Sequence, residues 1–523
     1  MAVNLIFSWK RLQQYLKFFQ QEEYDNKRFI NWYFANTTFD KKISLFCVLL
    51  LGVNLVYPLS LVVAAISFSL YALWLVFSEK NPTKFGKIKL KLTERAKRIY
   101  GLAFLLYLVL QIIWLSKLSL NPFNFLITQI FLFQILPFSL LLAKSLLQFD
   151  EDRRQRKFMQ EAKDKLAKIN PYVVGITGSY GKSTTKGILA KLMELSLGPT
   201  FWPPKSINTP MGITREIREN MKDFHKYAII EMGAYGIGSI KRLCDLTPPQ
   251  AGIVTVVGVA HLERYKTEEA ILKAKSELAQ AIPADGVLVC NADNAGTRKI
   301  AELCPKKQTL FYSLENKEVD CFADNIEFLE SGTKFSIHYQ SKVYSAFTRI
   351  HGRPAVSNIL AAFTLCCGLG ANPEVVIAAM GNIEPYNNRL EVVRLGGGLQ
   401  INDAYNSNPL GFKAALEVLQ QLKGARKILM TPGMIELGER QYSENFEVAK
   451  YAASICDTVV IVGLTNREAL EKGCIAGGLS AGKVLYAINR EEAFSIIAKI
   501  RTADDILLIE NDLPDLYEVD VKF

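Results

Sequence analysis

The sequence has few features of a zinc-binding or disulfide-bonded protein. Its 523 residues include nine cysteines and four histidines, but no two cysteines form a C-x-x-C pair. This argues against zinc and disulfide frameworks, so we expect buried thiols in a reducing compartment. The formal net charge is +11, yet no recognised nucleic-acid-binding motif accompanies it, and we expect no nucleic-acid partner.

Charge is absent from residues 43–77, a stretch of 35. One membrane-spanning helix needs only about 20 apolar residues, and Pro58 would break a helix in the middle of this stretch. A cleavable signal peptide is not expected, because this first apolar run begins too late in the chain. We predict about four transmembrane helices, near residues 43–57, 59–77, 100–116 and 123–143.

Basic residues flank these apolar runs unevenly. Residues 80–98 contain eight Lys or Arg and one acid, Glu94, and the first 42 residues contain seven Lys or Arg. Basic loops next to apolar spans usually lie on the cytoplasmic side. The pattern predicts a multi-pass protein of the bacterial cytoplasmic membrane, in contact with membrane lipid, whose catalytic domains lie in the cytoplasm. A buried helical domain is the alternative.

A glycine-rich turn joins an expected strand at residues 172–176 to an expected helix at residues 183–193. Its sequence is Gly178-x-x-Gly181-Lys182-Ser183-Thr184. Such a turn leaves backbone N–H groups free to face a phosphate, with the lysine near the terminal phosphates and the serine hydroxyl on Mg²⁺. Ile176 stands where a standard P-loop has glycine. The segment predicts a nucleoside triphosphate site.

After residue 165, short apolar strands alternate with amphipathic helices, which predicts a parallel sheet covered on both faces. Ligands bind outside the carboxyl ends of such strands. Glu231 and His261 each follow one of these strands, and with Ser183 they could hold Mg²⁺. Each of these residues alone is more often structural or solvated. The spacing around Lys275 alone favours a solvated helix face.

Several segments resemble the Mur ligase family in order and spacing. In the first half they are Gly178-x-x-Gly181-Lys182-Ser183-Thr184, Asn208-Thr-Pro-Met-Gly212, Glu231-Met-Gly-Ala234, Ala260-His261-Leu-Glu263 and Ala274-Lys275-x-Glu277. Later ones are His351-Gly-Arg, Asn388-Arg389-Leu-Glu391, Asp403-Ala-Tyr-Asn406-Ser-Asn408-Pro409 and Gly433-Met-x-Glu436-Leu-Gly438. The last two look most like the member that adds D-alanyl-D-alanine to a UDP-muramoyl tripeptide.

The resemblance implies an ATP-dependent amide ligase of peptidoglycan-precursor synthesis that works through an acyl phosphate. It implies that ATP is bound by Gly178, Ser179, Gly181, Lys182, Ser183, Thr184, Asn358 and Arg389. It also implies Mg²⁺, with two ions expected, held by Ser183, Glu231, His261 and Lys275, the last of these carbamylated. The residues expected to serve the chemistry directly are Lys182, Lys275, His261, Asp403 and Asn406.

The first 165 residues depart from this family, which normally begins with a soluble domain that holds the UDP-sugar. We therefore predict a membrane region at 1–165, a central ATP-binding α/β domain at 166–385 and a C-terminal Rossmann-like α/β domain at 386–523. Residues 308–350 are expected to form a small antiparallel insertion, in which His338 is structural. Asn445 stands where a histidine is common.

The departure at the N-terminus leaves the substrate open. The acceptor is a nucleotide-sugar peptide, or else a lipid-linked precursor or a growing poly-γ-glutamate chain. A non-catalytic membrane scaffold is disfavoured, because Lys182, Glu231, His261 and Lys275 are all present.

Overall fold

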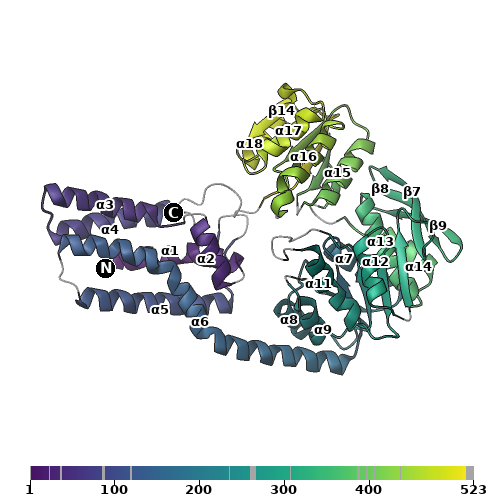
Figure 1. Cartoon of the computed structure of the whole chain (residues 1–523), viewed down its shortest axis with the longest axis horizontal. Helices are drawn as coiled ribbons and strands as arrows, with labels where there is room; N and C mark the ends of the chain where they lie inside the picture. The colour runs from purple at the N-terminus through teal and green to yellow at the C-terminus, as the bar shows by residue number, and fades with distance from the viewer. Residues whose placement is uncertain are drawn as a thin grey trace. The chain divides into compact units, whose positions relative to one another are not determined.

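The computed structural model describes the chain except for residues 1, 23, 36–37, 80, 85–88, 118–120, 235, 259–264, 266, 307, 386–388, 396–397, 405–406, 436 and 514–523. The described chain forms two compact units (Figure 1), a helical unit within Met1–Arg156 and an α/β unit, Lys157–Leu513. The domain boundaries expected at residues 165 and 385 stay predictions.

The helical unit consists of helices, several of them strongly apolar. They are α1 (Ala2–Gln21), α2 (Asn26–Ala35), α3 (Lys41–Val56), α4 (Leu61–Ser78), α5 (Glu94–Lys117) and the first part of α6 (Pro122–Ile169). The expected break at Pro58 is present, since α3 ends at Val56 and Ser60 caps α4 through a 3.2 Å bond from the Val63 N–H.

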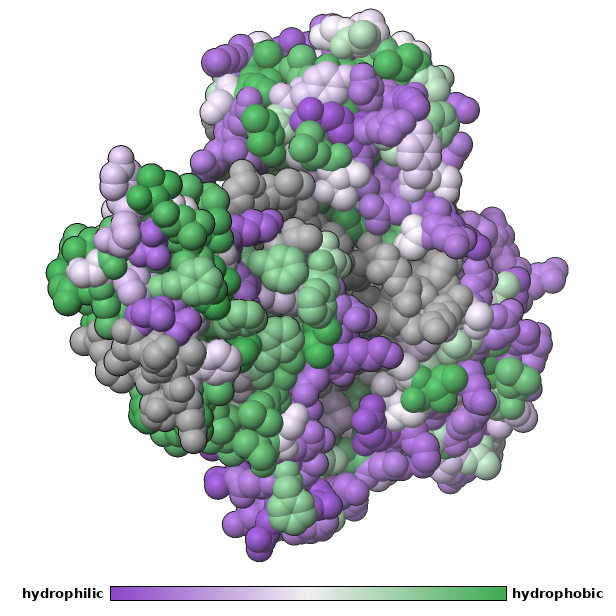
Figure 2. All heavy atoms as spheres, turned by 60° about the vertical axis from the view of Figure 1, so that its left-hand side comes forward, coloured by the Kyte–Doolittle hydropathy of each residue, from purple (hydrophilic) through white to green (hydrophobic). Residues whose placement is uncertain are grey.

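Three of the described helices are long and apolar enough to cross a membrane, judged by length and composition only. They are α4, residues Glu94–Trp114 of α5, and α6. The fourth expected span, α3, has 16 residues, which is shorter than the ~20 that a bilayer core requires. Figure 2 shows apolar side chains gathered on the surface of the helical unit, where Leu45, Leu55 and Phe77 are exposed.

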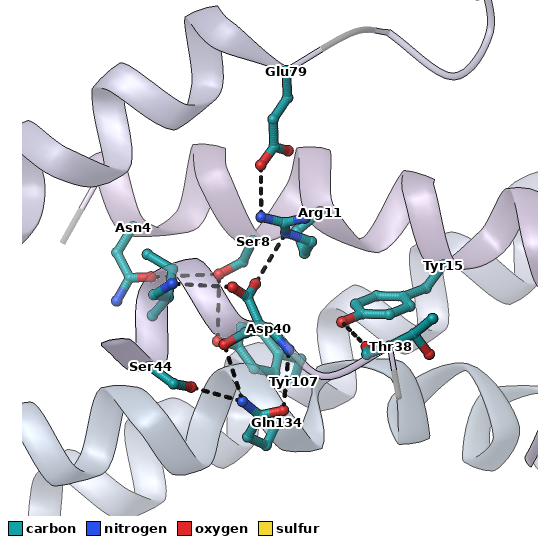
Figure 3. A network of polar contacts seen from close by, with 11 residues as sticks. Asn4, Ser8, Arg11, Tyr15, Thr38, Asp40, Ser44, Glu79, Tyr107 and Gln134 are labelled. Atoms are coloured by element: carbon teal, nitrogen blue, oxygen red, sulfur yellow. Dashed lines mark hydrogen bonds and ion pairs between the residues drawn. The ribbon is translucent and has the colours of Figure 1, made fainter. Parts of the chain in front are cut away.

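A charged network lies inside the helical unit (Figure 3). Arg11 Nε is 3.0 Å from Asp40 Oδ2, and Arg11 Nη2 is 2.6 Å from Glu79 Oε1. Arg11 and Asp40 are both buried. Asp40 also accepts a hydrogen bond from the Ile43 N–H at 3.2 Å, which caps α3. Because an unpaired buried charge is costly, this network fixes α1 against the start of α3 and the end of α4.

The α/β unit contains a nine-stranded sheet in the order β2-β3-β1-β4-β5-β6-β7-β8-β9. Its parallel strands are β1 (Tyr172–Thr177), β2 (Thr200–Phe201), β3 (Tyr227–Glu231), β4 (Ala251–Val254), β5 (Val287–Asn291) and β6 (Gln308–Ser313). These strands are short, buried and largely aliphatic, as parallel strands covered on both faces must be.

Helices cover both faces of this sheet (Figure 1). One core joins the strands to α7 (Lys182–Ser196), α13 (Arg353–Gly368) and α14 (Pro373–Met380). A second core joins them to α8 (Pro210–Asn220), α9 (Ser239–Leu246), α11 (Glu268–Ala281) and α12 (Ala295–Leu303). Because β1 and β3 pair in parallel, their carboxyl ends lie at the same edge of the sheet, where the phosphate loop follows β1.

The segment expected to be a small antiparallel insertion extends the main sheet. β7 (Cys321–Leu329) pairs parallel with β6, and β8 (Gly332–Tyr339) and β9 (Lys342–Thr348) continue it antiparallel. His338 lies on β8, with Nε2 2.9 Å from Asp324 Oδ1 and its ring stacked 4.1 Å from that of Phe322. These contacts fit the structural role expected for this histidine.

A second, six-stranded sheet follows, in the order β10-β11-β15-β12-β13-β14. β10 (Glu391–Leu395) is an antiparallel edge, and β11 (Gly398–Asp403), β12 (Lys427–Thr431), β13 (Thr458–Val462), β14 (Val484–Ala487) and β15 (Ile506–Glu510) are parallel. Its helices are α15 (Pro409–Gln421), α16 (Gln441–Ala453), α17 (Arg467–Ala476) and α18 (Arg490–Ile500). The predicted fold class, two α/β domains preceded by apolar helices, is confirmed.

Candidate active site

The phosphate loop, residues 178–184, connects β1 to α7. Gly181 has φ +81°, and a Cβ at this position would lie 2.6 Å from Asn358 Oδ1. Only glycine fits this combination of a left-handed backbone and a close neighbour. Thr185 Oγ1 donates to the same Asn358 oxygen at 3.1 Å, so α13 packs directly against the loop.

Two further residues of the loop fix its shape. Ser179 Oγ donates to the Gly258 carbonyl and accepts from the Gly258 N–H, both at 2.9 Å. Lys182 Nζ donates to the Gly178 carbonyl at 2.6 Å and to the Ser179 carbonyl at 3.2 Å. Burial lowers the pKa of Lys182, and the Glu231 carboxylate opposes that effect. The lysine head therefore lies on the loop, where a bound phosphate would meet it.

Glu231, at the end of β3, is almost fully buried beside Ser183. Its Oε1 accepts hydrogen bonds from Ser183 Oγ at 2.9 Å and from Asn208 Nδ2 at 3.0 Å. Within the described part of the chain, Oε2 has no aligned hydrogen-bond donor, although Lys186 Nζ lies 3.0 Å away. A hydroxyl beside a carboxylate is a set of hard oxygen donors, and Oε1 is the carboxylate oxygen on the side of Ser183. The residues present therefore fit a Mg²⁺ ion.

Lys275 lies on α11 with 4% of its surface exposed. Its pKa is well below the usual lysine value, first because of burial and then because of the positive charge of Lys182. Glu277 caps α9 by accepting hydrogen bonds from the backbone N–H groups of Gly238 and Lys241. Spacing alone predicted that Lys275 lies on a solvated helix face. That prediction is wrong, because the side chain is buried and the charge of Lys182 acts on it.

A residue just before the second sheet also reaches the phosphate loop, and two carboxyls lie at the ends of strands of that sheet. Arg389 Nη1 donates to Thr184 Oγ1 at 2.8 Å. Asp403, at the end of β11, accepts a hydrogen bond from the Leu390 N–H at 3.2 Å, and burial raises its pKa to about 6. Glu510 lies opposite Asp403 at the end of β15, and burial followed by the charge of Asp403 raises its pKa well above the usual value.

Most of these groups line one cleft of about 640 Å³, which is in the range of cofactor and substrate sites. Gly178, Lys275 and Glu510 are not among its lining residues. The lining residues that the sequence predicted are Ser179, Gly181, Lys182, Ser183, Thr184, Glu231, Asn358, Arg389 and Asp403. Sequence reasoning did not assign roles to Asn291, Asp293 and His351, which also line it. The first two stand at the end of β5, a position that the strand-end argument could have assigned.

Some predicted residues fall outside the description. His261 and Asn406 are not among the described residues, so their predicted roles stay predictions. Within the described ranges, no group of three or more His, Cys, Asp or Glu side chains could hold a metal ion. Asn445, the departure from the usual histidine, is buried and bonds the Met434 N–H at 2.8 Å and the Gln441 carbonyl at 2.7 Å. It orders the turn that follows β12.

Comparison with known proteins identifies two successive domains. The Mur ligase middle domain matches residues 176–366, and the Mur ligase glutamate ligase domain matches residues 388–510. A UDP-N-acetylmuramoyl-tripeptide–D-alanyl-D-alanine ligase of Mycobacterium tuberculosis (strain CDC 1551 / Oshkosh) is 32% identical over 363 residues, which are 65% of this chain and 70% of that protein. The relative of the same name from Mycobacterium bovis is 31% identical over 320 residues, 58% of this chain. The chain spans only 61% of the length of that relative.

A solved structure is also similar. The MurF ligase from Thermotoga maritima in complex with ADP superposes with a TM-score of 0.60 at 25% identity, over 68% of this chain and 80% of that one.

The predicted localisation is contradicted by these relatives. They are named as UDP-N-acetylmuramoyl-tripeptide–D-alanyl-D-alanine ligases, and three helices chosen by length and composition only are weak evidence for a multi-pass membrane protein. The prediction of a multi-pass protein of the cytoplasmic membrane is therefore wrong. Hydropathy cannot distinguish a lipid-facing helix from one packed in a core, and 56% of the apolar window of α6 is buried inside the protein.

The motifs, the fold and the comparisons agree over most of the α/β unit. The motif segments around Lys182, Glu231 and Arg389 lie within the two matched domains. One relative is 32% identical, and the chain covers 70% of its length. The chain belongs to the Mur ligase family.

Proposed function

We propose that this chain is an ATP-dependent amide ligase that joins D-alanyl-D-alanine to the carboxylate of a UDP-muramoyl tripeptide. The observation that carries the proposal is one cleft that combines the phosphate loop, the Ser183–Glu231 pair, Arg389 just before β10 and Asp403 at the end of β11. The relatives that bear this activity in their names, and the MurF structure with ADP, support it.

In the first step, a substrate carboxylate oxygen attacks the γ-phosphorus of ATP, and the bond to the bridging oxygen breaks to release ADP. Two anions must approach each other, so the main task of the protein is to position them and to compensate their charge. Lys182 and Arg389 both lie on the phosphate loop and supply that charge. A bound phosphate would favour the ammonium form of Lys182, against the effect of burial.

Mg²⁺ would be held by Ser183 Oγ and the Glu231 carboxylate, and when bound it would neutralise charge on the phosphate oxygens. Lys275 is the proposed ligand of a second ion, together with His261, after carbamylation. The neutral amine is the form of lysine that reacts with carbon dioxide, and the buried position of Lys275 favours that form. Its closeness to Lys182 would place the resulting carboxylate-like group near the phosphates.

In the second step, the amine of D-alanyl-D-alanine attacks the acyl phosphate, the carbon–oxygen bond to phosphate breaks, and the amide and inorganic phosphate form. The attacking ammonium must first lose a proton. Asp403 is our candidate acceptor, because it lies at the cleft and its pKa is raised to about 6, closer to neutral pH than an ordinary carboxyl.

The test is phosphate release from the purified full chain with ATP, Mg²⁺ and UDP-muramoyl tripeptide, with and without D-alanyl-D-alanine. We expect release that depends on the dipeptide and a product heavier by that dipeptide less water. Release only with a lipid-linked precursor or with glutamate would keep the ligase chemistry and reject the substrate. Absence of release with all three acceptors would reject the proposal.

A further inference from the structure

A second lysine of α7 lies against the proposed metal ligand. Lys186 follows Lys182 by one helical turn, and only 1% of its surface is exposed. Its Nζ is 3.0 Å from Glu231 Oε2. Glu231 is itself 1% exposed, and a buried carboxylate needs a nearby positive charge or strong hydrogen bonds to stay ionised.

Lys186 also has a backbone partner, the carbonyl of Lys205. Its Nζ donates to the Lys205 carbonyl at 2.6 Å, and Lys205 adopts a left-handed backbone with φ +53°. The next residue, Ser206, accepts a hydrogen bond from Ser183 Oγ at 3.1 Å. The ammonium of Lys186 is therefore fixed between a turn and Glu231, and its position is set before any ligand arrives.

The two oxygens of Glu231 consequently have different surroundings. Oε1 faces the donors Ser183 and Asn208, on the side of the phosphate loop. Oε2 faces Lys186. In addition, the charge of Lys182 acts on Glu231, and that of Arg389 acts on Lys182. Two lysines near one carboxylate leave no excess negative charge there to attract a divalent cation.

We propose that Lys186 makes metal binding at Glu231 depend on the nucleotide, because its ammonium already neutralises the carboxylate and leaves only Oε1 for the ion. A divalent cation then remains at the site only with the phosphate oxygens as additional ligands, which is how proteins commonly hold Mg²⁺. Lys186 is a positioning residue in this account. The inference rests on the proposed ATP and Mg²⁺ site.

The experiment measures Mn²⁺ binding to the nucleotide-free full chain, by the electron paramagnetic resonance signal of free Mn²⁺. The wild type is compared with Lys186→Met and with Lys186→Arg, which keeps the charge. We expect Lys186→Met to bind one Mn²⁺ at least roughly tenfold more tightly than the wild type, since a cation next to the site is removed. Lys186→Arg should bind as weakly as the wild type. With ADP present, all three should bind Mn²⁺.

A double variant, Lys186→Met with Glu231→Gln, is the matched control. It removes both charges. Proteins often still fold when both partners of a buried ion pair are replaced, whereas the loss of one partner leaves a buried charge unpaired. Its nucleotide-free Mn²⁺ affinity should return to the wild-type value. Equal affinities for the wild type and Lys186→Met would overturn the inference, and so would tight binding by Lys186→Arg or by the double variant.

Thermal unfolding with and without Mn²⁺ shows whether Lys186→Met still folds and gives a second measure of Mn²⁺ binding. The inference predicts that Mn²⁺ alone raises the melting temperature of this variant and leaves that of the wild type unchanged. An equal effect on both proteins would contradict it. The outcome is separate from the proposed function, because a wild type without ligase activity would reject that function while the nucleotide-free titration would still be readable.

Discussion

Replacement of Asp403 by asparagine should remove much of the loss of stability that the α/β unit suffers as pH rises. Asp403 and Glu510 end neighbouring parallel strands in register. Burial is the largest cause of the raised pKa of both carboxyls, about 6 for Asp403 and well above the usual value for Glu510. The amide oxygen of the new side chain would still be able to accept the hydrogen bond from the Leu390 N–H, so the backbone contact is kept.

The direction in which stability changes with pH follows from proton binding. A carboxyl whose pKa is higher in the folded than in the unfolded chain binds more protons when folded, so its contribution to stability is full below the unfolded pKa and falls as pH rises through the folded one. For Asp403 this window runs from the ordinary value of 3.8 to about 6. Across it, about 3 kcal/mol of stability is lost, at about 1.4 kcal/mol for each pH unit of difference.

The assay is thermal unfolding of the full chain at pH 4 and pH 8. A loss of about 3 kcal/mol corresponds to roughly 6 to 12 °C in a domain of ordinary size. Between pH 4 and pH 8, the melting temperature of the wild type should therefore fall by roughly 6 to 12 °C more than that of Asp403→Asn. The exposed neighbour Asp504 gives a control, since Asp504→Asn should follow the wild type. Parallel curves for the wild type and Asp403→Asn would refute the reasoning.

Four other substitutions test separate parts of the structure. Lys182→Ala should abolish ADP formation, because it removes the ammonium on the phosphate loop; retained turnover would contradict this assignment. Lys275→Ala should be inactive but partly rescued by short carboxylic acids, and a failure of rescue would count against carbamylation. Gly181→Ala should weaken ADP binding about tenfold by calorimetry, because a left-handed backbone costs a non-glycine residue ~1–2 kcal/mol; unchanged affinity would reject the strain. Arg11→Met should destabilise the helical unit by about 3–5 kcal/mol in denaturant unfolding, and a change below about 1 kcal/mol would contradict the role of its ion pairs.

The glycine-rich turn predicted the phosphate loop and the strand-end argument predicted Glu231, because both depend on local patterns. A glycine with a left-handed backbone and a hydroxyl after a lysine can be read over a few residues, and short aliphatic runs mark parallel strands. The sequence could not show that Lys186 contacts Glu231. Those two residues are 45 apart in the chain, and only the pairing of β1 with β3 brings α7 beside the end of β3.

The place of residues 308–350 in the sheet and the environment of the apolar helices could not be predicted, for the same kind of reason. The alternating pattern of residues 308–350 showed strands, but which edge they join depends on the parallel pairing of β6 with β7. The apolar helices were read as membrane spans because composition does not reveal what covers a side chain. Phe68, Phe133 and Leu136 are buried within the helical unit, whereas Leu45, Leu55 and Phe77 are exposed. Both decisions depend on long-range packing, which the periodicity of a single sequence does not contain.

The central claim, that a substrate carboxylate is activated as an acyl phosphate in the cleft of Lys182 and Glu231, is tested most directly with an oxygen label. The tripeptide carboxylate would carry oxygen-18, and the phosphate released in the presence of ATP and D-alanyl-D-alanine would be analysed by mass spectrometry. The account predicts one oxygen-18 atom in each phosphate, since the carbon–oxygen bond breaks in the second step. Unlabelled phosphate would mean that water attacked ATP, and would contradict the ligase mechanism.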